Sequence, residues 1–246
     1  MNTYRSAISL ISSNELGSHP LVSRFFKGVA VLKPQRPRYD FVWDPTPVVA
    51  HLATLYPHDN LSLEKLSRKL VTLLALTTAQ RMQTLAAIRL SNVVWSDSLI
   101  IKIPARLKTS RVGKTQPLLS FQPFLQKPEL CVFSLVRFYL NMTRDLRQEG
   151  CDSLFISFRS PHNAVSSQTL GRWVKGALND AGINIDTFSE HSTRHASTPF
   201  AASKGVNLDE IRRTAGWSRS SDVFARFYNR PIVTDTSFHS TILNSS

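Results

Sequence analysis

Apolar residues recur along most of this chain at steps of three and four positions, the spacing that gathers side chains on one face of an α-helix. The clearest run comprises Val132, Leu135, Val136, Tyr139 and Leu140. Asp44 or Thr46 is expected to cap another helix, with a proline in its first turn. Helices are predicted at residues 1–12, 44–56, 62–77, 79–90, 131–147, 167–181, 192–203, 208–215 and 221–228.

A second pattern, near the middle of the chain, predicts a small β-sheet. Apolar and β-branched residues cluster at 93–95 and 99–103, on either side of a turn of two serines and an aspartate. A third strand is expected at 116–121, after a basic loop at 106–114. The fold class is therefore mainly α with a small antiparallel β-sheet (α+β).

Two prolines and three positive charges in residues 33–39 indicate an extended basic linker. We therefore divide the chain into a short helical segment at 1–32, a linker at 33–43, a main domain at 44–231 and a tail at 232–246.

Charge narrows the range of partners. Thirty Lys and Arg oppose 17 Asp and Glu, a formal charge of +13, which favours a polyanion such as DNA, RNA or an anionic membrane surface. The basic residues are scattered rather than gathered on one amphipathic helix, so a membrane is disfavoured. No apolar run of ~18 residues and no signal peptide are evident, and we expect a soluble, intracellular protein.

Two cysteines and seven histidines are present, without the spacing of a disulfide framework or a metal site. We therefore expect no metal and no cofactor.

The residues with chemical potential form five separate motifs. They are Gln80-Arg81-Met-Gln-Thr-Leu85, Leu107-Lys108-Thr109, His191-Ser-Thr-Arg194-His195, Gly216-Trp217 and Phe227-Tyr228. In this order they resemble the tyrosine recombinase, or phage integrase, family, most closely the recombinase domains of DIRS-type mobile elements. The resemblance implies a tyrosine recombinase catalytic-domain-like fold for 44–231, and for 1–32 the remnant of an amino-terminal core-binding helical domain.

Chemistry supports the same assignment. Cleaving a phosphodiester without a metal requires other cations to stabilise the phosphorane, and the planar forks of Arg81 and Arg194 suit its non-bridging oxygens. Positive charge also stabilises a phenolate, so Tyr228 beside two arginines is the candidate nucleophile. Its attack would give a 3′-phosphotyrosyl bond and a free 5′ hydroxyl, and rejoining would need no ATP.

The resemblance assigns three further catalytic residues. Lys108 would protonate the leaving oxygen, although Lys102 and Lys114 are rivals for that role. His191, one helical turn before Arg194, would position or deprotonate the nucleophile. Trp217 would donate its indole N–H to the phosphate, after a left-handed helix cap at Gly216.

Each residue also has a simpler interpretation. Arg81 is then a surface charge, Arg194 a non-specific phosphate contact, Lys108 a solvated loop lysine and His191 a helix-end residue without a task. Trp217 and Tyr228 are then packing aromatics. Contacts to DNA outside the catalytic set are predicted for Lys33, Arg36, Arg38, Arg106, Arg111, Lys114 and His195, the last as a packing residue or a secondary phosphate contact.

Three departures from the family pattern bear on activity. Thr84 stands where most members have an acidic residue, and the step from Trp217 to Tyr228 is longer than usual. Pro199 falls inside a predicted helix and is expected to kink or end it. The amino-terminal segment is also short for a DNA clamp, which suggests a truncated copy.

The expected function is DNA strand exchange on double-stranded DNA, by a homotetramer on DNA, with a monomer as the alternative when the protein is free. Alternatives are a decayed or domesticated DNA-binding protein, a type IB topoisomerase and, more distantly, an RNA-binding module. An origin in a eukaryotic mobile element would place the protein in the nucleus, and otherwise it would be cytoplasmic.

Overall fold

The computed structural model describes residues 2–12, 16, 19–33, 39–104, 118–217, 228 and 232–233 of the chain. The chain forms two compact units, Met1–Tyr39 and Asp40–Ser246. The first contains α1 (Asn2–Ile11) and α2 (Pro20–Leu32), so a helix also forms at a segment for which none was predicted. Its two helices border an apolar groove of about 430 Å³ lined by Tyr4, Ile8, Leu16, Leu21, Val22, Phe25 and Phe26.

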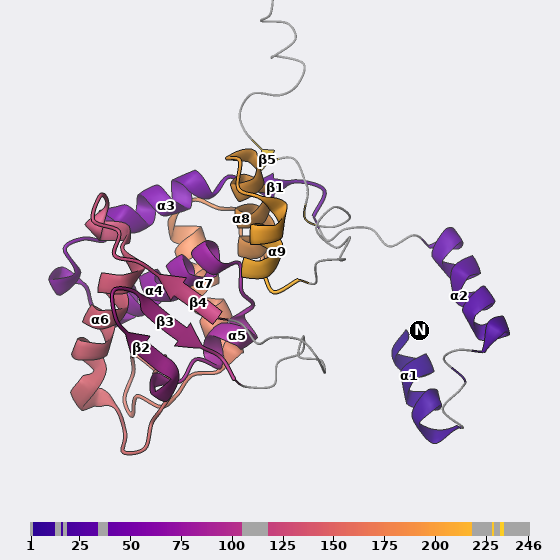
Figure 1. Ribbon diagram of the computed structural model, residues 1–246, viewed down its shortest axis with the longest axis horizontal. Helices are drawn as coiled ribbons and strands as arrows, with labels where there is room; N and C mark the ends of the chain where they lie inside the picture. The colour runs from indigo at the N-terminus through magenta and orange to yellow at the C-terminus, as the bar shows by residue number, and fades with distance from the viewer. Residues whose placement is uncertain are drawn as a thin grey trace, which may run out of the picture. The chain divides into compact units, whose positions relative to one another are not determined.

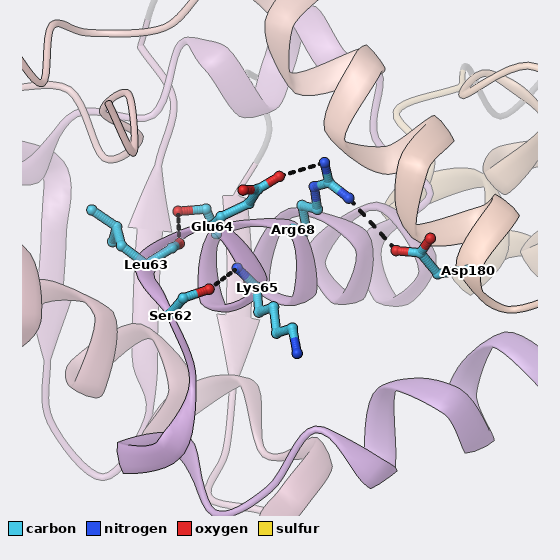
Figure 2. A network of polar contacts seen from close by, with 7 residues as sticks. Ser62, Leu63, Glu64, Lys65, Arg68 and Asp180 are labelled. Atoms are coloured by element: carbon cyan, nitrogen blue, oxygen red, sulfur yellow. Dashed lines mark hydrogen bonds and ion pairs between the residues drawn. The ribbon is translucent and has the colours of Figure 1, made fainter. Parts of the chain in front are cut away.

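The second unit is built around α4 (Leu63–Thr78), which packs against α6 (Val132–Thr143), α7 (Ser167–Asp180) and α8 (Ser192–Ser203) (Figure 1). The helix expected at 62–77 is present, shifted by one residue: α4 begins after Ser62, whose hydroxyl accepts a hydrogen bond from the Lys65 amide at 3.3 Å. The Arg68 guanidinium, on α4, lies 2.5 Å from Glu64 on the same helix and 3.6 Å from Asp180 on α7 (Figure 2). The second contact joins α4 to α7.

The predicted sheet is confirmed. Strands β2 (Val93–Trp95), β3 (Leu99–Lys102) and β4 (Leu118–Phe121) form an antiparallel sheet in the order β2-β3-β4. Leu99, Ile101 and Leu119 are buried on one face, which follows from the alternation of side chains along a strand.

A second, two-stranded sheet was not predicted. Strand β1 (Val42–Trp43) pairs in parallel with β5 (Ile232–Val233), and both contact α8 (Figure 1). The Trp43 indole N–H donates to the Ser192 hydroxyl at 2.8 Å, which fixes the start of α8. Both strands lie outside the range 44–231 that the sequence assigned to the main domain, yet both belong to the second unit.

Three further α-helices and four short 3-10 turns belong to the described part of the second unit. Helix α3 (Pro45–Thr54) begins after Asp44, whose carboxylate accepts from the Thr46 amide at 2.8 Å, and α9 (Leu208–Thr214) follows α8. The helix expected at 79–90 is wrong at both ends, because α5 covers only Met82–Ala86. The helix expected at 131–147 is shorter than predicted, because α6 ends at Thr143. The helix expected at 221–228 lies outside the described residues, except for Tyr228. Short 3-10 turns occur at His58–Asn60, Leu90–Asn92, Pro128–Leu130 and Arg144–Leu146.

Pro199, which was expected to kink or end its helix, does not end α8. The helix continues to Ser203, although a proline has no N–H to donate to the carbonyl of His195. Two hydroxyls in the same turn bind other carbonyls, since Ser197 donates to Thr193 and Thr198 to Arg194, each at 2.8 Å. The helix therefore loses one backbone hydrogen bond without breaking.

Lys69 is fully buried within α4. Its ammonium donates to the Leu55 carbonyl at 2.6 Å and lies 3.3 Å from His58 Nε2. Burial lowers the pKa of Lys69 from 10.5 to about 8, against an opposing effect of Glu129. Burial and the neighbouring lysine also lower the pKa of His58, so its neutral ring can accept this hydrogen bond.

This lysine makes the stability of the unit depend on pH. Between its folded pKa of about 8 and its ordinary value of 10.5, the unfolded state binds more protons than the folded state. The free energy of unfolding should therefore rise by ~2 kcal/mol between pH 7 and pH 9.5, and Lys69→Met should lose that rise. Urea unfolding at the two pH values measures it. Lys65→Met, an exposed change on the same helix, is the control; an equal pH dependence in Lys69→Met and wild type would contradict the prediction.

Within the described residues, no helix is long and apolar enough to cross a membrane.

Candidate active site

The site begins at the turn between α4 and α5. Helix α4 ends because Ala79 adopts a left-handed conformation, with φ at 50°. The buried Gln80 donates from Nε2 to the Thr214 carbonyl at 2.6 Å, which fastens the turn to the end of α9. Arg81 follows in extended conformation as the residue before α5, half-buried. This local geometry projects Arg81 from a turn rather than from the side of a helix.

Arg194 holds the same turn from α8. Its side chain is only 4% exposed, and Nη1 donates to the Ala79 carbonyl at 3.0 Å. Nε and Nη2 are also buried, and neither has a hydrogen-bond partner among the described residues. A buried donor without an acceptor is costly. The guanidinium is therefore preorganised to receive an anion with two acceptor oxygens.

The charge at this position is not balanced by acid. Burial, against an opposing effect of Tyr228 and with a smaller contribution from the nearby Arg81, lowers the pKa of Arg194 to about 10. Arg194 thus stays protonated at neutral pH. No carboxylate in the described part of the chain forms an ion pair with either arginine. Two neighbouring cations that have no carboxylate partner among the described residues favour binding of a phosphate.

Tyr228 lies against this arginine, within an aromatic cluster. The Arg194 Cζ atom is 4.4 Å from the centre of the Trp217 ring and 5.5 Å from that of Tyr228. The Tyr228 and Trp217 ring centres are 4.6 Å apart, with 55° between the planes. On another side, Tyr228 stacks on His195 at 4.1 Å and 17°. The structure thus brings Arg194, Trp217 and Tyr228 together. Arg81 is near enough to lower the pKa of Arg194.

Trp217 is placed by the expected left-handed cap, which is confirmed. Gly216 has φ at 68° and follows α9. Its amide donates to the Arg213 carbonyl at 3.1 Å, and the Trp217 amide donates to the Arg212 carbonyl at 2.8 Å. These bonds end α9 and turn the chain, so that the indole reaches Arg194.

The two histidines of the HxxRH motif occupy different environments. His191 stands just before α8 with its side chain about half exposed, and its Nε2 is 3.5 Å from a Glu190 carboxylate oxygen. His195 is 9% exposed and is the ring that stacks on Tyr228. The sequence connected His191 with the nucleophile, which stays a prediction, and left His195 as a packing or phosphate-contact residue; the stack on Tyr228 is a packing contact of His195.

Some of the predicted site residues belong to segments outside the described part of the chain. The catalytic candidate Lys108 and the DNA-contact candidates Arg36, Arg38, Arg106, Arg111 and Lys114 lie outside the described residues. Lys33 is described and exposed, at the end of α2 in the first unit. Lys102, the rival of Lys108, is exposed at the end of β3.

Gln80 and Ser192 are positioning residues that sequence reasoning did not single out. Gln80 joins the turn before Arg81 to the end of α9, and Ser192 accepts the hydrogen bond that anchors the start of α8. A signal existed for Gln80, because it opens the Gln-Arg-x-Gln-Thr-Leu motif. No group of three His, Cys, Asp or Glu among the described residues is placed to hold a metal ion.

Comparison with solved structures supports the fold. The chain is similar to the XerH site-specific recombinase bound to difH substrate before cleavage (14% identity, TM-score 0.57, covering 86% of this chain and 55% of that one). It is also similar to the XerA recombinase (16%, TM-score 0.56, 99% and 81%). A third is the Tn1549 transposon integrase in complex with circular intermediate DNA (11%, TM-score 0.52, 87% and 66%).

The chain spans about half the length of the XerH recombinases it matches. At these identities the likeness concerns the fold, which is that of tyrosine recombinase catalytic domains. No curated protein matches the chain in sequence. The sequence model of the phage integrase family, however, matches residues 50–232, well over half of the chain and the whole of the cluster around Arg194. The chain therefore belongs to the phage integrase family.

Proposed function

We propose that this protein is a tyrosine-type recombinase that cuts and rejoins double-stranded DNA through Tyr228. One observation carries the proposal: the Tyr228 phenol lies against Arg194, a buried guanidinium with two N–H groups that have no partner among the described residues. An arginine in that state is suited to the non-bridging oxygens of a phosphodiester, and its position defines where the phosphorus atom would sit relative to the phenol.

The proposed reaction is an in-line displacement at phosphorus. The Tyr228 oxygen loses its proton and forms a bond to phosphorus, while the bond from phosphorus to the 5′ oxygen breaks. Arg194 and Arg81 stabilise the additional negative charge of the phosphorane, and the Trp217 indole is a further donor. The leaving 5′ oxygen takes a proton from a general acid, for which Lys108 is our candidate. His191 is our candidate for positioning or deprotonating Tyr228.

Reversal of these steps rejoins the strand. The 3′-phosphotyrosyl bond retains the energy of the phosphodiester, so a 5′ hydroxyl from another strand can attack it without ATP. The proposed partner is duplex DNA, in agreement with the family, the net charge of +13 and the DNA substrates of the XerH and Tn1549 structures. The proposal includes a homotetramer on DNA, a nuclear location and an origin in a DIRS-type element. The Gln80–Leu85 motif supports that origin.

The test is capture of a covalent complex on DNA of random sequence, because the target sequence is not known. The protein is incubated with a pool of nicked duplexes whose bases around the nick are randomised, in the presence of EDTA. The expected result is a DNA–protein adduct that survives denaturation, has a free 5′ hydroxyl and disappears with protease. Binding of the pool without any adduct would instead identify a decayed, DNA-binding copy. Relaxation of supercoiled plasmid without strand exchange would identify a topoisomerase.

A further inference from the structure

We infer that His195 is a positioning residue, whose imidazole holds the Tyr228 ring beside Arg194; the inference rests on the proposed function. The two ring centres are 4.1 Å apart and the planes differ by 17°. This is a nearly parallel stack, whereas the Trp217 ring meets Tyr228 at 55°. A flat contact over one face restricts both the position and the tilt of the phenol.

His195 is well suited to act as a fixed surface. It is 9% exposed and lies in α8 between Arg194 and the fully buried Ala196. That part of α8 is held at two points on other elements, because Trp43 donates to Ser192 and Arg194 donates to the Ala79 carbonyl. The imidazole is thus carried by an anchored helix, while the phenol that it contacts is only half-buried.

The stack connects the nucleophile to the phosphate-binding residue. Arg194 and His195 are consecutive in α8, so one short stretch of backbone carries both the guanidinium and the surface on which Tyr228 rests. Any displacement of the phenol along the imidazole changes its distance to the phosphate that Arg194 binds. Because the reacting atoms must be held near 3 Å in a defined direction, loss of the flat contact is expected to slow attack without weakening DNA binding.

Three variants separate stacking from the other roles open to this histidine. His195→Phe keeps a flat ring but removes the ring nitrogens, whereas His195→Gln keeps a polar group but removes the ring. His195→Leu keeps only apolar volume. The rate of adduct formation is compared with the dissociation constant for the same DNA across a range of salt concentrations.

We expect His195→Gln and His195→Leu to form the adduct ~10-fold more slowly than wild type. Their dissociation constants and their salt dependence should be unchanged, and His195→Phe should retain a rate within ~3-fold of wild type. A loss in His195→Phe equal to that in His195→Gln would overturn the inference. So would weaker binding with a shallower salt dependence in all three variants, since that result identifies a phosphate contact.

A spectroscopic measurement tests the stack independently of activity. The five tyrosines are replaced by 3-fluorotyrosine, and the ¹⁹F resonance of residue 228 is assigned as the one that Tyr228→Phe removes. A ring stacked on imidazole experiences a ring-current shift, which His195→Phe should preserve and His195→Gln should remove. An unchanged resonance in His195→Gln would overturn the positioning role. If wild type forms no adduct while the shift behaves as expected, the proposed function fails and the ring-holding contact stands.

Discussion

Tyr228→Phe is expected to abolish the covalent adduct completely. The change removes a single oxygen, the atom that would bond to phosphorus, and keeps the ring that contacts His195, Trp217 and Arg194. The fold and the phosphate site should therefore remain intact, and DNA affinity should stay within about twofold of wild type. Adduct formation on the nicked pool and a binding titration on the same DNA measure the two effects.

Tyr56→Phe is the matched control, since Tyr56 is exposed and belongs to the same unit. It should form as much adduct as wild type. A covalent complex that persists in Tyr228→Phe would show that another residue is the nucleophile. Peptide mapping of the adduct would then identify that residue.

Arg194→Lys is expected to slow adduct formation ~10³-fold, the effect of losing a preorganised donor to a developing charge. An ammonium keeps the positive charge, but it lacks the planar fork. It cannot reach the Ala79 carbonyl and at the same time offer two parallel N–H groups to a phosphate. The measurement is the single-turnover rate at saturating protein, with the melting temperature recorded for each variant.

Arg172→Lys on α7 controls for a general effect of the substitution, because Arg172 is exposed and its hydrogen bond goes to Thr169 on its own helix. Its rate should equal that of wild type. If Arg194→Lys retained a rate within ~10-fold of wild type, the guanidinium would be a structural tie to Ala79 rather than the phosphate donor.

Sequence predicted the elements whose signals are local. Asp44 caps its helix as one of the two expected candidates, Gly216 ends α9, and the hairpin of β2 and β3 follows from its apolar strands and short turn. In each case the residue that determines the structure lies within a few positions of the structure it determines.

Features that depend on distant contacts were not predictable in the same way. Ala79 interrupts the helix expected at 79–90 with a left-handed residue, although alanine favours helices, and the Arg194 hydrogen bond from α8 stabilises that turn. Strands β1 and β5 contain two residues each, too few for any alternation to be visible. Only the tertiary structure shows that His195, rather than His191, stacks on the phenol.

The parallel pairing of β1 with β5 also has a mechanical consequence. Parallel strands run in the same direction, so the chain leading to Val42 and the chain leading to Ile232 reach the pair from the same end. If the chain before Val42 is pulled, the hydrogen bonds between β1 and β5 resist the pull in shear. Strand β5 begins at Ile232, four residues after Tyr228. Backbone hydrogen bonds of ~0.5–1.5 kcal/mol each transmit that load. A force on the chain before Val42 is therefore carried by the same strand pair that anchors the chain four residues after Tyr228.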